Sequence, residues 1–547
     1  MNADEYYLDI DKENFYLGII SQVFRGNSYV QVENLSLLRD RKIHNEVLIP
    51  NTINYFVVIE DTQGLFIGEV FQSKVQDTDI VNQAINRGQI DHVFPEIGID
   101  IIGCMNPQHS FQLPGFRTVG INDKVYIANT KIVKAYQDSL EILSNVASND
   151  QKIQEPLQNL ATFANFPGMT FSVKPNTLFD RHLLVVGSTN SGKSTSALSI
   201  MDKLINNKIK LLIIDPTGEY HDSFPESYVE RLTLGENAFL PVGDVTMSQW
   251  ELLFQTNDNT QGAVLSDAIR SLRFNYKENN KNEVYHKSGK KVTEVERDLS
   301  SISNTDTTFN LLKLPEQIIE ESVELNTQRG HTDEYVFRNF RANANAWLEQ
   351  KIQHQFQYSS LTQFFTEGSE GSKLLRKIDC FCNQRETSLY IDTSKIGLSD
   401  GIGTMIIDLL SNYIINKPAK SLKPFVLFVD EVHRYTQFQN ELTSSFSGLI
   451  NIAREGRKKG VFLFLTTQSP CDVPKILLSQ IGTLLIHRLT SIEDLQLIRN
   501  HLDEHSQKQI INLNQGEALL TSINLLKDVQ LDFAKSDRTH YNQTPLL

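Results

Sequence analysis

From residue 182 onward, short apolar runs alternate with amphipathic helical patterns. Each run has four to six nearly continuous apolar residues, as in strands that are buried on both faces of a parallel sheet. The runs are His182 to Val186, Leu211 to Ile214, Phe425 to Val429 and Val461 to Thr466. After the first run, apolar residues from Ala197 to Ile205 recur at helical spacing. This alternation predicts a doubly wound α/β domain.

The front of the chain has a shorter rhythm. Between residues 14 and 130, apolar or alternating runs rich in Val, Ile, Tyr and Phe are separated by turn residues such as Gly26-Asn27 and Pro114-Gly115. Short strands at this spacing predict a small antiparallel barrel or sandwich. A helical pattern from Lys131 to Ser148 and a polar run then lead into the α/β part.

A third segment, residues 240–385, is polar and helix-prone, and we interpret it as a helical insertion between sheet strands with Trp250 and Trp347 as anchors. The predicted units are an N-terminal barrel with its linker helix, the first part of the core, the insertion, the second part of the core, and a C-terminal strand and tail. Their ranges are 1–150, 151–239, 240–385, 386–525 and 526–547.

Composition restricts where on the protein a phosphate-binding surface can lie and in which compartment we expect the protein. The 66 acidic residues exceed the 52 basic ones, and residues 1–150 hold 20 acidic and 11 basic side chains, so any phosphate-binding surface must be local and lie outside the barrel. No apolar stretch reaches membrane-spanning length, and the first residues lack a signal-peptide pattern, so we expect a cytoplasmic protein with no membrane contact. Four cysteines without paired spacing do not predict a zinc site.

The most informative motif follows the first apolar run and precedes a helix. Residues 187–194 fill the pattern G-x-x-x-x-G-K-[ST], in which glycines let backbone N–H groups converge on phosphates and a helix N-terminus adds positive potential. We expect Lys193 to face the β- and γ-phosphates of ATP and Ser194 to ligate Mg²⁺. The predicted nucleotide-binding residues are Gly187, Ser188, Thr189, Asn190, Ser191, Gly192, Lys193, Ser194 and Thr195.

A second motif ends the run Phe425 to Val429 with two acids. Asp430 is predicted to hold the water shell of Mg²⁺, and Glu431 to orient and deprotonate the attacking water. Adjacent carboxylates suit hydrolysis better than nucleotide holding alone. The alternative is an ordinary strand end with solvated acids.

Two further strand ends point to the same edge of the sheet. Asp215 and Glu219 follow the run Leu211 to Ile214, and Gln468 follows the run Val461 to Thr466. Ligands of open α/β folds bind at the carboxyl ends of the strands. Gln468 is a candidate sensor of the γ-phosphate, whereas Asp215 has either a catalytic or Mg²⁺-linked role or the structural role usual for Asp at a strand end.

These motifs resemble the HerA branch of the HerA and FtsK translocases over about residues 165–525. The resemblance rests on the segments Phe179 to Thr189, Asp215 to Tyr220, Val429 to His433, Ala453 to Gly460 and Thr466 to Pro470. It implies a RecA/FtsK-like P-loop NTPase core of α/β class, preceded by a small β-barrel. It also implies a homo-hexameric ring with ATP at subunit boundaries and double-stranded DNA in a central pore. Asn190 stands where the family often has Gly.

In such a ring an arginine from one subunit reaches the γ-phosphoryl group bound by the next. The resemblance makes Arg457 the first candidate, Arg454 the second and Arg181 the third, with a solvated surface position as the alternative for each. Lys458 and Lys459, or the lysine-rich stretch Lys277 to Lys291, are candidates for DNA phosphate contacts.

Two functional hypotheses remain. In the first, the protein is an ATP-driven motor that feeds duplex DNA to a partner nuclease. In the second, it is an ATPase scaffold for an effector of antiviral defence, either a nuclease or an NAD-consuming, sirtuin-like subunit. No second catalytic signature occurs in this sequence, so any second chemistry should come from another polypeptide, and the barrel is its expected docking surface because it is the most acidic part. A membrane-coupled pump is disfavoured because no membrane-spanning stretch is found.

Overall fold

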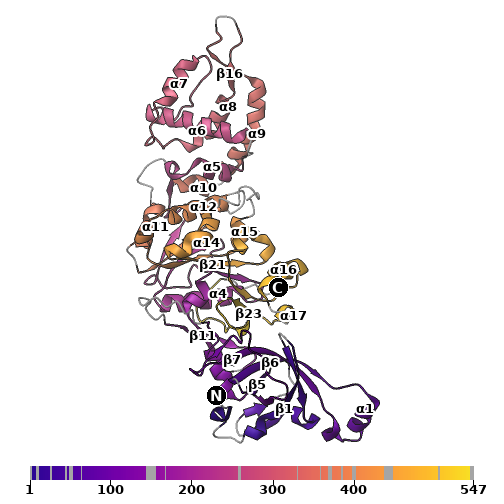
Figure 1. Cartoon of the computed structure of the whole chain (residues 1–547). Helices are drawn as coiled ribbons and strands as arrows, with labels where there is room; N and C mark the ends of the chain where they lie inside the picture. The colour runs from indigo at the N-terminus through magenta and orange to yellow at the C-terminus, as the bar shows by residue number, and fades with distance from the viewer. Residues whose placement is uncertain are drawn as a thin grey trace, which may run out of the picture.

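The protein is elongated, with a helical region at one end, a β-barrel at the other and a large sheet between them (Figure 1). The computed structural model describes residues 3–7, 12–24, 27–43, 46–48, 53, 55–62, 64–142, 155–166, 168–256, 260–328, 331–357, 359–366, 373–383, 386–396, 402–436, 448–502 and 506–541. No helix among these residues is long and apolar enough to cross a membrane.

The N-terminal region is a closed antiparallel barrel, which confirms the prediction. Its six strands run in the order β2-β1-β9-β5-β6-β7, and pairing of β2 with β7 closes the barrel. They are β1 (Tyr16–Val23), β2 (Asn27–Val32), β5 (Phe56–Asp61), β6 (Gly64–Lys74), β7 (Glu96–Met105) and β9 (Lys124–Ile127). The short strands β3 (Arg41–Ile43) and β4 (Glu46–Leu48) pair with each other, and β8 (Phe111–Gln112) pairs antiparallel with the end of β7.

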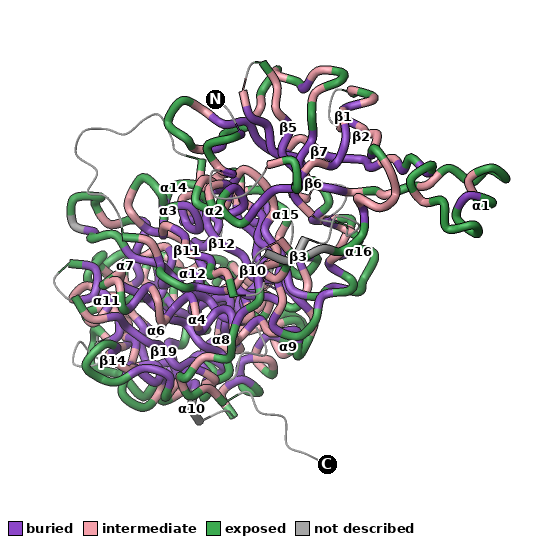
Figure 2. Tube along the Cα trace, turned by 90° about the horizontal axis from the view of Figure 1, so that it is seen from below, coloured by how far each residue is buried: buried purple, intermediate pink, exposed green. Residues whose placement is uncertain are grey.

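Two helices belong to this region. Helix α1 (Asp79–Asn86) lies in the connection from β6 to β7 and projects away from the body of the molecule (Figure 2). Helix α2 (Thr130–Asp138) begins at Asn129, whose side chain accepts a hydrogen bond from the Ile132 N–H, and packs its buried face on the barrel core.

The core is built on an eleven-stranded sheet. Seven neighbouring strands are parallel, in the order β22-β12-β21-β20-β13-β19-β14, and β23, β24, β10 and β11 continue the sheet antiparallel beyond β22. The parallel strands are β12 (Leu183–Val186), β13 (Lys210–Asp215), β14 (Val229–Thr233), β19 (Ser388–Asp392), β20 (Phe425–Val429), β21 (Val461–Thr467) and β22 (Thr483–Ile486). The others are β10 (Leu157–Phe163), β11 (Thr170–Val173), β23 (Glu517–Ser522) and β24 (Val529–Asp532).

Both faces of this sheet are covered, as the nearly continuous apolar runs predict. On β12, Leu183 and Val185 join one apolar cluster together with residues of helix α4 (Lys193–Asn206) and of the barrel. Leu184 and Val186 join the other cluster, which contains helices α12 (Ile402–Ile415) and α14 (Gly448–Lys459). Alternate residues of a strand point to opposite faces, so each such strand stabilises two layers at once.

The helical insertion lies between β14 and β19. Its helices are α5 (Met247–Phe254), α6 (Gln261–Lys277), α7 (Val292–Ser300), α8 (Leu314–Glu320), α9 (Asn339–Phe356), α10 (Ser359–Phe364) and α11 (Lys373–Asn383). Trp250 is fully buried and stacks on Phe254, with ring centroids 5.7 Å apart. The prediction that Trp347 is an anchor was wrong, because Trp347 is 70% exposed and α9 buries Leu348 and Ile352 instead.

The described chain also has short strands and short α-helices, besides several 3-10 helices. They are β15 (Leu240–Pro241) with β18 (Phe365–Thr366), β16 (Val323–Leu325) with β17 (Tyr335–Phe337), and the helices α3 (Pro175–Phe179), α15 (Lys475–Leu478), α16 (Ile492–Ile498) and α17 (Ser506–Ile510). The barrel contacts the core through an ion pair between Glu69 and Lys527 and through stacking of Phe56 on Phe166.

Candidate active site

The glycine-rich turn connects β12 to α4 at the carboxyl edge of the sheet. Gly192 has φ 113°, and a Cβ there would lie 2.9 Å from the backbone N of Gly516. A Cβ on Gly187 would lie 2.6 Å from Cβ of His487. Both fixed glycines of the motif are therefore required by a left-handed backbone or by close packing against the chain beneath the turn.

Lys193 folds back over this turn. Its Nζ donates hydrogen bonds to the carbonyl oxygens of Gly187 at 2.7 Å and Ser188 at 3.2 Å. Burial lowers the pKa of Lys193, while Glu431 and Asp430 oppose that shift. The ammonium group is thus held inside the turn and within the field of the acids on β20.

His487 supports the turn from below, and sequence reasoning missed it. The Ser196 hydroxyl of α4 lies 2.8 Å from Nε2 of His487, and Nδ1 lies 2.9 Å from the carbonyl oxygen of Glu517. Because a carbonyl only accepts, Nδ1 carries the proton and Nε2 accepts from Ser196. Burial lowers the pKa of His487 to about 4, so the ring is neutral. The one local signal was a histidine directly after an apolar strand.

The predicted acid pair stands at the tip of β20. Asp430 is buried, and its Oδ1 accepts a hydrogen bond from the Thr466 hydroxyl at 2.6 Å. The same hydroxyl oxygen accepts the Glu431 N–H at 2.8 Å. Burial raises the pKa of Asp430, and the neighbouring Asp215 raises it further. Glu431 has φ 46°, so the chain turns sharply where its carboxylate leaves the strand.

Gln468 joins the glycine-rich turn to the acid pair. Its Oε1 accepts a hydrogen bond from the Thr189 hydroxyl at 3.3 Å, and its Nε2 donates to Oε1 of Glu431 at 3.2 Å. This is possible because β21, which carries Gln468, lies between β12 and β20. The other carboxylate oxygen of Glu431 lies 3.2 Å from Nδ1 of His433, a contact that sequence reasoning also missed.

Asp215 is buried at the end of β13 and is saturated by donors from its own chain. Its Oδ1 accepts hydrogen bonds from the Thr217 N–H, the Thr217 hydroxyl and the Gly218 N–H, and its Oδ2 accepts from the Tyr220 N–H and the Tyr390 hydroxyl, all at 2.9 Å. This arrangement favours the structural alternative, in which Asp215 holds the loop that carries Glu219.

The donor set fits a magnesium ion shared with phosphate. No group of three or more His, Cys, Asp or Glu side chains in the described part of the chain is arranged to hold a metal. Mg²⁺ needs no such group, since it usually keeps several waters and is bound by one or two protein oxygens plus substrate phosphates. Asp430 is a buried carboxylate beside other acids, and Ser194 opens α4 next to Lys193, so these two residues are the ones that would hold the ion.

The three candidate arginines lie at the opposite edge of the sheet. Arg181 precedes β12, and Arg454 and Arg457 lie in the last turns of α14, directly before β21. All three are exposed, and Arg457 pairs with Asp180, its Nε 3.0 Å from Oδ1. β12 has four residues, so at about 3.3 Å per strand residue its length puts roughly 13 Å between this edge and the turn of the same subunit. The sequence also predicts a helix from Leu442 to Arg454, of which residues 442–447 lie outside the described ones.

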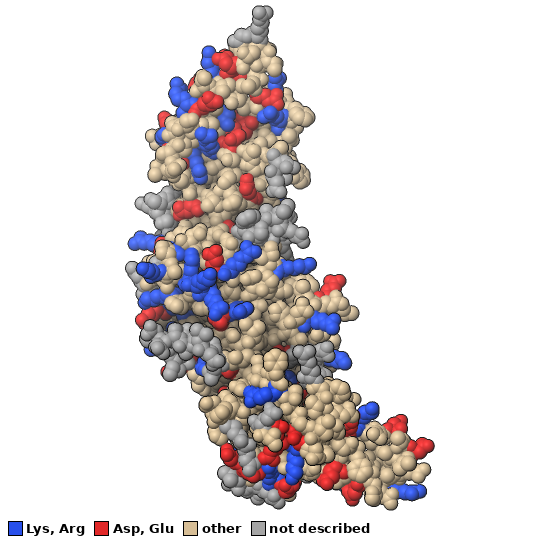
Figure 3. Space-filling model, in the orientation of Figure 1, with Lys and Arg blue, Asp and Glu red and all other residues tan. Residues whose placement is uncertain are grey.

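Lysine and arginine side chains gather on the core at the level of α11 and α14 (Figure 3). Lys458 is exposed there, whereas Lys459 donates to the carbonyl oxygen of Ile415. Four of the five lysines in the stretch Lys277 to Lys291 pair with carboxylates, which counts against its predicted phosphate contact, whereas Lys281 is exposed and lies over the ring of Tyr276. Lys287 is buried in an ion pair with Glu321, and the other lysines that pair with carboxylates are Lys277, Lys290 and Lys291.

Two family models match the chain. The helicase HerA central domain matches residues 159–370, and the helicase HerA-like C-terminal domain matches residues 404–524, together more than half of the sequence. The chain belongs to the HerA family. The glycine-rich turn at residues 187–194 lies within the central-domain match, and the acids Asp430 and Glu431 lie within the C-terminal match.

Individual HerA-type relatives agree. A probable helicase of Methanocaldococcus jannaschii is 26% identical over 63% of this chain and 60% of its own length. The DNA double-strand break repair helicase HerA of Sulfolobus acidocaldarius is 24% identical over 62% of each chain. The matches therefore span less than two thirds of these relatives. Among solved structures, the bacterial conjugative coupling protein TrwBdeltaN70 is 14% identical with a TM-score of 0.47, covering 74% of this chain and 95% of that chain.

Proposed function

We propose that this chain is an ATPase whose hydrolysis of ATP drives movement along double-stranded DNA. The observation that carries the proposal is the bridge from Thr189 through Gln468 to Glu431. It places a phosphate-binding turn and a carboxylate able to activate water in hydrogen-bonding continuity within one subunit, as hydrolysis of a bound terminal phosphate requires.

Each residue has one task in this reaction. The turn N–H groups and Lys193 hold the β- and γ-phosphates, and Glu431 orients a water and takes its proton as the water attacks phosphorus. Gln468 contacts both the turn and Glu431, so it can report the presence of the γ-phosphate to the base. Mg²⁺ held by Ser194 and Asp430 would supply charge neutralisation on the phosphate oxygens.

Completion of the site requires a second copy of the chain. The charge that develops on the γ-phosphoryl group needs a cation, and Arg457, Arg454 and Arg181 lie too far from their own subunit's turn to provide it. In a homo-hexameric ring, the edge that carries them faces the neighbouring subunit's site, and duplex DNA passes through the central pore. A ring also multiplies each exposed lysine by six, so an acidic chain can still surround DNA phosphates.

An ATPase scaffold for an antiviral effector is the second candidate, and helix α1 favours it. This helix projects from the barrel, and its Ile80 is 81% exposed, with Ile85 and Phe94 exposed nearby. Exposed apolar residues on a projecting element suit a docking partner, either a nuclease or a sirtuin-like subunit. The motor and the scaffold use the same ATP site, and they differ in whether ATP hydrolysis drives movement along DNA.

Measuring ATP turnover with and without duplex DNA, together with displacement of a protein roadblock from a linear duplex, separates these candidates. A motor is stimulated by duplex DNA and clears the roadblock at a rate that depends on ATP. An unchanged turnover rate and an undisturbed roadblock would reject the motor and leave the scaffold.

A further inference from the structure

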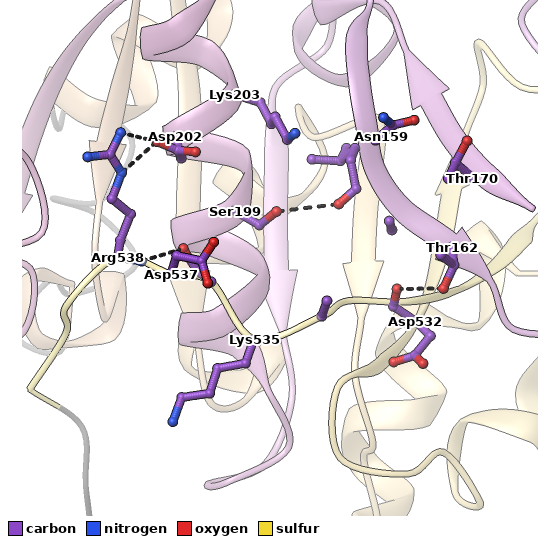
Figure 4. Close-up of a pocket in the computed structure, with 14 residues that line it drawn as sticks. Asn159, Thr162, Thr170, Ser199, Asp202, Lys203, Asp532, Lys535, Asp537 and Arg538 are labelled. Carbon is purple, nitrogen blue, oxygen red and sulfur yellow. Dashed lines mark hydrogen bonds and ion pairs between the residues drawn. The ribbon is translucent and has the colours of Figure 1, made fainter. Parts of the chain in front are cut away.

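Two ion pairs that hold an arginine at the surface of the core differ in geometry. Arg538 donates to Oδ1 of Asp202 in α4 through Nε and pairs with it through a second nitrogen, each at 2.8 Å, beside the cleft of about 440 Å³ that Figure 4 shows. Arg457 contacts Oδ1 of Asp180 through Nε at 3.0 Å, and its side chain is 53% exposed, against 28% for Arg538. Arg457 is therefore held by the nitrogen nearest its stem and stays open to a second molecule.

His182, two residues after Asp180, ties the chain before β12 to the helix that carries Arg457. Its Nε2 lies 3.0 Å from the carbonyl oxygen of Ala453 in α14, and its Nδ1 accepts a hydrogen bond from the Leu463 N–H of β21 at 2.9 Å. Because a carbonyl only accepts and an N–H only donates, Nε2 carries the single ring proton. Burial lowers the pKa of His182, and the charge of Arg457 also lowers it, which agrees with a neutral ring.

The carbonyl that His182 binds is also part of the helical turn that ends at Arg457. In an α-helix the N–H of residue i donates to the carbonyl of residue i−4, so the Ala453 oxygen also receives the Arg457 N–H. His182 is buried, and its φ of 61° is a left-handed conformation that a residue with a Cβ rarely adopts. Strained backbone of this kind gathers where the position of a group matters for function.

Two glycines keep the same corner close-packed. A Cβ on Gly456 would lie 2.7 Å from the carbonyl oxygen of Val461, and a Cβ on Gly482 would lie 2.7 Å from Cβ of Arg181. The Gly482 N–H donates to the carbonyl oxygen of Arg181 at 2.7 Å. Residues 180–182 are therefore fixed between the end of α14 and the start of β22, and the end of α14 cannot shift without breaking these contacts.

We infer that His182 and Asp180 are positioning residues, which hold the backbone and the guanidinium of Arg457 in the place from which it serves the ATP site of the neighbouring subunit. The inference rests on the proposed function, because it presumes that Arg457 acts across a subunit boundary. His182 directly precedes β12, which leads to the glycine-rich turn. One strand of four residues therefore joins the turn that holds a subunit's own phosphates to the arginine that this subunit provides to its neighbour.

The first test uses two substitutions of His182 in the full chain. His182→Asn tolerates the left-handed backbone and keeps an acceptor near the place of Nδ1, but its amide is too short to reach Ala453. His182→Gln puts an amide nitrogen near the place of Nε2. We expect kcat for ATP to fall about 10²-fold in His182→Asn with unchanged ATP affinity, and to recover in His182→Gln, because a displaced catalytic group loses about this much.

Mixed rings distinguish positioning from a general loss of structure. His182→Asn subunits have an intact base and a displaced arginine, so they should regain turnover when combined with Glu431→Gln subunits and not with Arg457→Ala subunits. A subunit that is only misfolded would regain turnover with neither. Regain with Arg457→Ala, no regain with Glu431→Gln, or an ATP affinity that falls together with kcat would overturn the inference.

Asp180→Asn tests the side-chain contact at a half-buried position, where the fold tolerates substitution. It should lower kcat and regain turnover with Glu431→Gln subunits. The matched control is Glu455→Gln, which removes an exposed carboxylate from the same end of α14 and should keep wild-type turnover. Wild-type turnover in His182→Asn or in Asp180→Asn would overturn the role of that residue and leave the proposed function standing. A wild-type chain that does not hydrolyse ATP would overturn the proposed function and the inference with it.

Discussion

The two edges of the parallel sheet differ in how their charged residues are used. At the carboxyl edge, Lys193 is hydrogen-bonded to the turn, Asp430 to Thr466, and Glu431 to Gln468. Lys193 and Asp430 are buried, and Gln468 is exposed. At the amino edge, the exposed cations are Arg181, Arg454, Lys420, Lys423 and Lys458, and the exposed Arg457 pairs with the half-buried Asp180.

This difference shows which part of the proposed reaction one subunit can perform by itself. Bonded, partly buried groups are pre-organised before a ligand arrives, which is what an active site requires. Exposed cations at the far edge have no reacting group within their own subunit. Under the proposed function a neighbouring copy supplies that group, and substitutions at both edges test this contrast.

The largest effect is expected at the amino edge. Arg457→Ala should lower ATP turnover by about 10³ to 10⁵ while leaving ATP affinity nearly intact, because the arginine acts only on charge that develops during transfer. The rate of ATP turnover checks the predicted loss, and equilibrium binding of ATP checks the predicted affinity. Lys423→Ala, another exposed cation of the same edge, should keep wild-type turnover.

Mixing two kinds of inactive subunit tests whether Arg457 acts across the boundary between subunits. Arg457→Ala and Glu431→Gln subunits should regain part of their turnover when combined, since some boundaries then pair an intact arginine with an intact base. No regain at any mixing ratio, with mixed rings verified by mass, would contradict action between subunits. If ATP turnover were lost in Arg454→Ala and kept in Arg457→Ala, Arg454 would be the arginine that acts on the neighbouring subunit's γ-phosphoryl group.

At the carboxyl edge, Glu431→Gln should lower turnover by about 10² to 10⁴ and preserve ATP binding, because the amide keeps the shape and cannot take a proton. Single-turnover hydrolysis and nucleotide binding are the measurements. Lys193→Ala should lose binding as well, since it removes the cation inside the turn. Persisting turnover in Glu431→Gln would reject Glu431 as the base.

A smaller effect concerns the support beneath the turn. The pKa of His487 is lowered to about 4 in the folded protein, against about 6.5 when unfolded, so only the unfolded chain takes up a proton in this window. The free energy of unfolding should therefore fall by up to about 3 kcal/mol as pH drops from 6.5 to 4. Denaturant unfolding of the wild type and His487→Gln should give a flatter pH dependence for the variant. Equal slopes would contradict a neutral buried imidazole.

The smallest effect concerns DNA. Lys458→Ala should weaken duplex binding for all sequences alike and reduce the salt dependence by about one unit of slope per contact. Titration at several salt concentrations measures this. Lys291, which pairs with Asp333 in the insertion, is the matched control, and its change to Ala should leave DNA binding unaltered. The reverse pattern would place the DNA at the insertion.

Sequence reasoning succeeded where the signal was local. The strands β12, β13, β20 and β21 agree with the predicted apolar runs, because burial on both sheet faces needs continuous apolar residues. It failed for Trp347, since an aromatic residue on a helix does not tell which face is covered. It also treated the charges of Lys277 to Lys291 as free, although their partners, such as Glu321 and Asp333, come later in the chain.

The amino-acid sequence by itself determined the phosphate-binding turn and the acid-tipped strand, because each depends on a few consecutive residues whose backbone and neighbours are set locally. Only the tertiary structure decided that Gln468 spans Thr189 and Glu431 and that His487 contacts Ser196. These meetings follow from the order of strands in the sheet. That order emerges from packing of the whole chain and is not written in any single segment.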